Sequence, residues 1–253
     1  MSTHYTYDEL VNKFDIKCDH NTDKDLFVSI MNGNFNKEID ETIDPNILFN
    51  IGKYYQYIKK DYDMMKIYYY IAIDYSNTSA MNNLASYYKE IEKNYDMMKK
   101  YYLMSIDKGN SNAMNNLGSY YYCIEKNYDM VKKYFLMAID GGHSFTMNNL
   151  AIYYNNIEKD YDMMKKYYLM AIDNGCSNAM NNLAIYYNNI EKDYDMAKKY
   201  YLMSKLKSAK KEDECIVCYE EKKHMYYTNC NNHYICCECS VQLFEEKCPM
   251  CRQ

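Results

Sequence analysis

Eight residues of the types that bind zinc lie together near the C-terminus of this 253-residue sequence. They follow the spacing Cys215-x2-Cys218-x11-Cys230-x2-His233-x2-Cys236-x2-Cys239-x8-Cys248-x2-Cys251. Two ligands separated by two residues can reach one tetrahedral ion at a Zn–S distance of ~2.3 Å. Four such pairs supply the ligands of two closed Zn²⁺ sites with no open coordination position. We therefore expect structural zinc that supplies folding free energy to a segment too short to build its own core.

The chain before the zinc pattern repeats itself with a period of 33 residues. A first phrase of the type Ala-Met-Asn-Asn-Leu-Ala-x-Tyr-Tyr begins at Ile47, Ala80, Ala113, Thr146 and Ala179. A second phrase of the type I-E-K-[DN]-Y-D-M-x-K-K-Y-[YF]-L-M follows. Five tandem copies of one unit predict a stacked array.

Apolar residues in both phrases recur at helical spacing. In the second repeat, one stripe consists of Met81, Leu84, Ala85 and Tyr88, and the other of Met97, Tyr101 and Met104. Each unit is therefore predicted to be a helical hairpin. One hairpin cannot bury both of its faces alone, so we expect neighbours to stack into a right-handed superhelix with a concave groove.

Residues that begin and end helices recur with the same period. The predicted N-caps of the second helix are Asn94, Asn127, Asp160 and Asp193, and the predicted left-handed C-terminal positions are Gly109, Gly142 and Gly175. We also expect i,i+4 ion pairs along the second helices: Asp96 to Lys100, Asp129 to Lys133, Asp162 to Lys166, and Asp195 to Lys199.

The repeat pattern over residues 47–207 resembles Sel1-like and tetratricopeptide repeats. The resemblance rests on small residues at the tight helix contact, namely Ala85, Gly118, Ala151 and Ala184, and on an aromatic position held by Tyr88, Tyr121, Tyr154 and Tyr187. The sequence lacks the Gly-rich insertion usual in Sel1-like repeats and the terminal proline of tetratricopeptide repeats. Residues 1–46 are interpreted as capping helices or a degenerate repeat, and residues 208–214 as a charged linker.

A row of asparagines recurs on the first helix of each repeat: Asn82, Asn115, Asn148 and Asn181, each followed by a second asparagine. In the tetratricopeptide register these positions lie on or beside the groove. An amide both donates and accepts, so the row could pair with an extended segment of a protein substrate or adaptor. The alternative is that the amides hydrogen-bond between neighbouring helices.

The zinc pattern resembles the C3HC4 form of the RING family of ubiquitin ligases. Pro249 inside Cys-Pro-Met-Cys and Arg252 after the last ligand add to the likeness, which covers Cys215 to Arg252. It implies a small α+β domain over residues 215–253. It also implies interleaved ligands, with Cys215, Cys218, Cys236 and Cys239 on the first Zn²⁺ and Cys230, His233, Cys248 and Cys251 on the second.

The RING resemblance implies an activity without a covalent intermediate on the ligase. Such a domain holds a ubiquitin-charged conjugating enzyme (E2) so that its thioester meets a substrate lysine. The family's E2-docking positions fall on Val217, Leu243 and Pro249, and Arg252 occupies the linchpin position that contacts both E2 and ubiquitin. Arg252 is the only arginine in a chain otherwise rich in lysine.

Two functions compete on these grounds. The first is a RING-type E3 ubiquitin transferase whose solenoid recruits a substrate or adaptor. The second is a non-enzymatic interaction scaffold with a structural zinc module. The presence of Val217, Leu243, Pro249 and Arg252 favours the ligase, because a structural cap needs only the metal ligands.

Composition narrows the setting of a mostly α-helical chain. A net charge of −5 and a pI near 5.6 argue against nucleic-acid binding. No apolar run is long enough to span a membrane and the N-terminus has no secretory signal pattern, so we expect a soluble protein without a membrane partner. Seven zinc-binding cysteines beside four others indicate a reducing cytoplasm or nucleus. The bias towards Asn, Tyr, Lys and Ile resembles proteins of giant DNA viruses of amoebae, which would place it in the host cytoplasm with host E2 and ubiquitin.

Overall fold

The computed structural model describes residues 44–205, 225–227 and 234–236, and these are mostly helical as predicted. The chain divides into an N-terminal unit, Met1–Leu117, and a C-terminal unit, Gly118–Gln253. Within the described ranges, no helix is long and apolar enough to cross a membrane.

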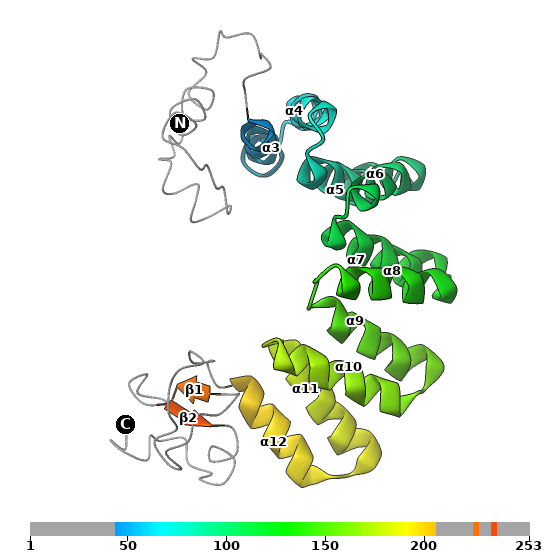
Figure 1. Cartoon of the computed structure of the whole chain (residues 1–253), viewed down its shortest axis with the longest axis vertical. Coiled ribbons are helices and arrows are strands. Elements are labelled where there is room, and N and C mark those ends of the chain that lie inside the picture. The colour runs from blue at the N-terminus through cyan, green and yellow to red at the C-terminus, as the bar shows by residue number, and fades with distance from the viewer. Residues whose placement is uncertain (1–43, 206–224, 228–233, 237–253) are drawn as a thin grey trace. The chain divides into compact units, whose positions relative to one another are not determined.

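The N-terminal unit contains helical hairpins in chain order (Figure 1). Its elements are α3 (Pro45–Tyr54), η1 (Tyr55–Lys59), α4 (Tyr62–Asp74), α5 (Thr78–Tyr87), η2 (Tyr88–Glu92) and α6 (Tyr95–Asp107). Helix α7 (Ser111–Tyr120) crosses the division between the units. Helix α3 begins at Pro45, within the range predicted for the N-terminal cap; the rest of that predicted segment lies outside the described residues.

The C-terminal unit continues the same alternation of first and second helices. Its elements are η3 (Tyr121–Glu125), α8 (Tyr128–Asp140), α9 (Thr146–Tyr153), η4 (Tyr154–Glu158), α10 (Tyr161–Asp173), α11 (Ser177–Tyr186), η5 (Tyr187–Glu191) and α12 (Tyr194–Lys205). Figure 1 shows α9 beside α10 and α11 beside α12 as successive hairpins. The predicted stack of hairpins is thus confirmed within the unit.

The predicted helix starts and stops are confirmed. Asn94 accepts a hydrogen bond from the backbone N–H of Met97 at 3.1 Å, and Asp160 accepts one from that of Met163 at 3.0 Å. Asn127 and Asp193 cap α8 and α12 in the same way. The helix-ending glycines have positive φ angles of 83° at Gly109, 85° at Gly142 and 79° at Gly175.

The buried stripe of the first helix was predicted correctly, whereas of the three residues predicted for the second helix only Tyr101 is buried. Met81, Leu84, Ala85 and Tyr88 are all buried. On α6 the buried face is formed by Met98, Tyr101, Tyr102 and Ser105, while Met97 and Met104 are half-exposed. Tyr101, Tyr102 and Ser105 follow Met98 by three, four and seven residues, so all four side chains lie on one face of the helix.

The predicted i,i+4 ion pairs are also corrected by the structure. Asp162 pairs with Lys165, three residues on, at 3.9 Å. Lys166 instead places its ammonium 5.6 Å from the ring centroid of Tyr167. The negative face of the neighbouring ring attracts the cation that would otherwise reach Asp162.

Each first helix ends in a π-helical turn that the sequence did not reveal. The turn closes on a lysine in the left-handed conformation: Lys60, Lys93, Lys126, Lys159 and Lys192 have φ between 55° and 58°. In the second repeat, the backbone N–H groups of both Lys93 and Asn94 donate to the carbonyl of Tyr88. The turn thereby satisfies a helix-end carbonyl and places Asn94 at the next N-cap.

The small residue at Gly118 permits a close helix contact, as the repeat pattern predicted. A Cβ atom there would lie 2.7 Å from Cδ1 and 2.8 Å from Cε1 of Phe135. Those distances are shorter than van der Waals contact, so glycine lets α7 and α8 pack at this point.

In the zinc-binding region the structure describes two strands, β1 (Met225–Tyr227) and β2 (Tyr234–Cys236). They are antiparallel, with Met225 opposite Cys236 and Tyr227 opposite Tyr234. Two predicted zinc ligands, Cys230 and His233, fall in the sequence between the strands, and a third, Cys236, ends the second strand. The pairing is compatible with the small α+β domain that was predicted.

Candidate functional site

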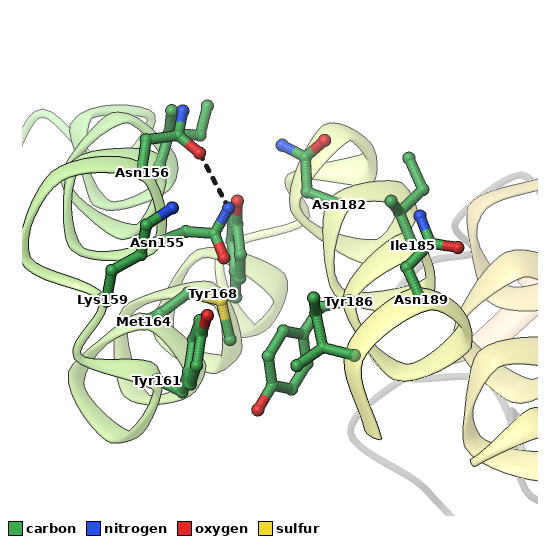
Figure 2. A pocket seen from close by; sticks show the side chains of 12 residues that line it. Asn155, Asn156, Lys159, Tyr161, Met164, Tyr168, Asn182, Ile185, Tyr186 and Asn189 are labelled. Atoms are coloured by element: carbon green, nitrogen blue, oxygen red, sulfur yellow. Dashed lines mark hydrogen bonds between the residues drawn. The ribbon is translucent and has the colours of Figure 1, made fainter. Parts of the chain in front are cut away.

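The C-terminal unit contains a pocket of about 370 Å³ between two consecutive hairpins (Figure 2). The first hairpin supplies Ile152 from α9, Asn155 and Asn156 from η4, Lys159, and Tyr161, Met164 and Tyr168 from α10. The second supplies Asn182, Ile185 and Tyr186 from α11, and Asn189 and Ile190 from η5. Stacking of the two hairpins therefore creates the pocket, and neither could form it alone.

Side-chain amides dominate the polar part of this pocket. Asn155 donates to Oδ1 of Asn156 at 2.8 Å, and Asn156 donates to the hydroxyl of Tyr122 at 3.2 Å. Asn182 donates to Oδ1 of Asn148 at 3.1 Å. Figure 2 shows Asn155 and Asn156 on one side of the pocket and Asn182 and Asn189 on the other. The amides are held in place by these bonds while their remaining donors and acceptors border the pocket.

Three tyrosines also line the pocket. Tyr161 and Tyr186 come from the two hairpins with their ring centroids 5.3 Å apart. Burial raises the pKa of Tyr168, with Tyr122 adding to the rise and a hydrogen bond from Asn182 opposing it. The Tyr168 hydroxyl is therefore protonated at neutral pH and can act as a hydrogen-bond donor.

A second, shallower hollow of about 750 Å³ adjoins the pocket. Ile185 and Asn189 line both, so the two hollows are neighbours on either side of these side chains. The second is also lined by Asn181, Ala184, Asn188, Tyr194, Ala197, Lys198 and Tyr201. Tyr194 and Tyr201 are 64% and 52% exposed, so aromatic surface is available to a ligand here.

Asn181, a member of the predicted asparagine row, lines the second hollow, whereas other lining residues could not be found from the features that the repeats share. Three positions that differ between repeats carry the lining: Ile152, Asn155 and Asn156 in the fourth, and Ile185, Asn188 and Asn189 in the fifth. The second repeat has Ser86, Lys89 and Glu90 at the same positions. A comparison of the differences among the repeats could have identified them.

The asparagine row makes the internal hydrogen bonds that the sequence left open as an alternative. Asn116 donates to Oδ1 of Asn82 at 3.0 Å, and Asn115 donates to Asn116 at 3.5 Å. Asn148 is 9% exposed and accepts from Asn182, whereas Asn181 accepts from Ser204 at 2.6 Å and lines the second hollow. Peptide binding by the row stays a prediction, with Asn181 the member best placed to reach a ligand.

Most of the predicted zinc-site residues lie outside the described part of the chain. These are Cys215, Cys218, Cys230, His233, Cys239, Cys248 and Cys251, together with Val217, Leu243, Pro249 and Arg252. Only the backbone position of Cys236 is described. Within the described residues, no three His, Cys, Asp or Glu side chains come together as a metal site would require. The zinc assignment therefore rests on the donor set and its spacing.

Comparison with known families identifies the zinc-binding region. Residues 211–253 match the family described as "Zinc finger, C3HC4 type (RING finger)". This segment contains all eight predicted ligands, so the match agrees with the resemblance drawn from their spacing. No curated protein sequence matches the chain.

Comparison with solved structures identifies the fold of the repeats. A Sel1 repeat protein from Oxalobacter formigenes is similar with a TM-score of 0.56 and 20% identity, over 70% of this chain and 81% of that one. The protective antigen c5321 of uropathogenic Escherichia coli, described as displaying an SLR fold, gives 0.58 and 22%, over 78% of this chain but 44% of its own. At these identities the likeness shows the fold alone: the array is an α-solenoid of Sel1-type repeats.

Proposed function

We propose that the protein is a RING-type E3 ubiquitin ligase whose repeat array recruits a protein substrate or adaptor. The RING-family match over residues 211–253 carries this proposal. The RING segment follows a solenoid of the Sel1-repeat fold in the same chain. Stacked repeats offer an extended binding surface, which supports recruitment by the repeats and E2 positioning by the RING segment.

The zinc module would hold two Zn²⁺ ions in closed tetrahedral sites. Cys215, Cys218, Cys236 and Cys239 would bind the first, and Cys230, His233, Cys248 and Cys251 the second. The donor set fits, since seven thiolates and one imidazole complete both shells without a water ligand. Bound zinc supplies folding free energy, and it leaves the chemistry of transfer to the E2.

The chain's own residues would position the E2. Val217, Leu243 and Pro249 would offer an apolar docking surface, and Arg252 would donate hydrogen bonds to both E2 and ubiquitin. Holding the charged E2 in one orientation lowers the entropic part of the barrier to attack by a lysine amine. The nucleophile is then the substrate's, and no group on this chain forms a covalent bond with ubiquitin.

A lysine-discharge assay with purified chain and ubiquitin-charged E2 tests the proposal. Arg252→Ala should bind uncharged E2 almost as the wild type does, yet slow discharge by about tenfold or more, because the clamp is lost while docking remains. Val217→Ala should weaken E2 binding itself, since it removes part of the apolar contact. If the wild type and both variants discharge ubiquitin no faster than charged E2 does alone, the function is that of an interaction scaffold.

A further inference from the structure

The fourth and fifth repeats carry the same three residues at the positions that border the pocket and the hollow beside it. These are Ile152, Asn155 and Asn156 in one repeat and Ile185, Asn188 and Asn189 in the next. Four of the six are exposed and Ile152 and Asn155 are half-buried, so the fold does not require their side chains as core. Their identity in two adjacent repeats gives a continuous surface of one chemical character.

The second repeat uses the same positions in a different way. Ser86 hydrogen-bonds to the Tyr102 hydroxyl at 2.9 Å, and Lys89 pairs with Glu90 at 2.9 Å. Those polar groups are engaged with partners of their own repeat. In the fourth repeat Ile152 replaces the serine, so the hydroxyl of Tyr168, the counterpart of Tyr102, loses that partner and lines the pocket with Asn182.

Relative to the second repeat, the fourth and fifth repeats have neutral asparagines in place of the charged Lys89 and Glu90, and isoleucine in place of Ser86. Ile185 is 57% exposed, although burying it would be favourable, and it adds to the exposed isoleucine that the repeats share at Ile91 and Ile190. Neutral amides cost less to desolvate than charged groups and can pair with both the N–H and C=O of a peptide bond. Lys159 is the one formally charged side chain among the described residues that line the pocket itself, and Lys198 lines the hollow beside it.

We propose that the pocket between the fourth and fifth repeats binds an extended polypeptide segment that is uncharged at the contact and inserts an aliphatic side chain between Ile152 and Ile185. The inference rests on the proposed recruiting role of the array and names the kind of segment recruited. Asn155, Asn182 and Asn189 pair with the backbone of the bound segment, and the isoleucines select its side chain. Lys159 disfavours a lysine or arginine beside that side chain.

A variant that copies the second repeat into the site tests this assignment. Ile152→Ser, Asn155→Lys, Asn156→Glu, Ile185→Ser, Asn188→Lys and Asn189→Glu together introduce only residues that the chain already uses at equivalent positions. The variant is therefore expected to fold, which its helix signal and melting temperature check. The matched control is Leu136→Ser, Leu169→Ser and Asn178→Lys, which changes exposed residues of similar types that do not line either hollow.

The probe is a random-peptide phage library selected on the full-length chain, followed by fluorescence anisotropy with synthetic peptides of the consensus. The wild type and the control should select peptides with an aliphatic residue free of basic neighbours. The variant with six substitutions should bind these peptides roughly tenfold more weakly or not at all. The same consensus and affinity on this variant, a charged consensus, or binding of neutral oligosaccharides without peptides would each overturn the proposal.

Discharge of ubiquitin to free lysine separates this inference from the ligase proposal. Free lysine needs no recruitment by the array, so the variant with six substitutions should discharge ubiquitin from E2 at the wild-type rate. If discharge fails in the wild type while peptide selection depends on the pocket, the ligase proposal falls and the peptide site stands. If discharge succeeds but no peptide consensus appears, the peptide site falls alone.

Discussion

Lys132 and Glu158 lie 26 residues apart in the sequence and form an ion pair of 2.8 Å between consecutive hairpins. The same glutamate oxygen accepts a hydrogen bond from the Tyr153 hydroxyl at 2.7 Å. Lys165 and Glu191 repeat the contact at 3.0 Å, and Lys66 and Glu92 make it at 3.1 Å in the N-terminal unit. A lysine and a glutamate thus connect each of these hairpins to the next, and a tyrosine of the glutamate's own hairpin binds Glu158.

Acid should weaken the array through these glutamates. The hydrogen bond from Lys132, followed by that from Tyr153, holds the pKa of Glu158 below its ordinary value of 4.5, and Glu191 shows the same direction. A lowered folded-state pKa means that the stabilisation is complete above the unfolded pKa and is lost as pH falls through the folded pKa. Melting followed by the helix signal at pH 7 and pH 3 should show a smaller loss in Glu158→Gln/Glu191→Gln than in the wild type. An unchanged pH profile would contradict the prediction, and Asp140→Asn serves as the control.

A methyl group at position 118 should destabilise the C-terminal unit. Alanine gains about 1 kcal/mol of helix propensity over glycine. Its Cβ would nevertheless lie 2.7 Å from Phe135, and overpacking of that kind costs about 1–3 kcal/mol. Gly118→Ala should therefore lower the denaturation midpoint, and adding Phe135→Leu should recover part of the loss. A stabilised Gly118→Ala would show that Phe135 moves aside at little cost.

Glycine should be better than lysine at the left-handed position that ends a first helix. Lys126 has a φ of 57°, a conformation that costs a side-chain-bearing residue about 1 kcal/mol. Lys126→Gly should stabilise the unit by about 0.5 kcal/mol after the entropy of glycine is subtracted. Lys133→Gly, the same substitution within α8, should destabilise it by about 1 kcal/mol. Chemical denaturation of both variants measures the predicted difference in sign.

Loss of the Asn148 amide should weaken the contact between the fourth and fifth repeats. Asn148 accepts from Asn182 and is nearly buried, so alanine leaves that donor without its partner. We expect Asn148→Ala to cost about 1–2 kcal/mol of stability. The exposed Asn178→Ala should be close to neutral. If the two substitutions change the stability equally, the hydrogen bond between Asn148 and Asn182 does not stabilise the array.

Metal analysis should find two equivalents of zinc per chain. Eight ligands in four pairs close two tetrahedra, and one equivalent or none after purification without chelator would remove the assignment. Chelation should release both ions but leave most of the helix signal, because none of the predicted ligands lies in the repeat array.

Local chemistry made much of the repeat fold predictable. Asn94 and Asp160 were identified as N-caps because a short polar side chain satisfies an N–H group only three residues away. Gly109 and Gly142 were identified because few other residues accept a positive φ. The left-handed Lys93 and Lys126 could not be predicted this way, since lysine has no preference for that conformation. In the structure, the backbone N–H groups of Lys93 and Asn94 donate to the carbonyl of Tyr88, and the ring of Tyr88 stacks on Tyr101 at 5.7 Å.

The pocket was harder to predict because it needs two hairpins in register. Ile152 and Ile185 are 33 residues apart and line one site only because α9 and α11 belong to adjacent hairpins. The asparagine row was correctly seen as a regular feature, but only the structure shows Asn148 facing Asn182. For the zinc region the sequence was sufficient to reach the family, since ligand order and spacing are themselves the signal.

The recurring contact between hairpins makes the C-terminal unit extensible. The surface that α8 offers to α9 is offered again by α10 to α11, with Lys132–Glu158 and Lys165–Glu191 in corresponding places. Duplication of residues 146–178 would therefore join surfaces that already match, and no interface would have to be redesigned. Each added copy would bring another counterpart of Ile152, Asn155 and Asn156 to the same face. Gene duplication could therefore add binding sites to the recruiting surface one repeat at a time.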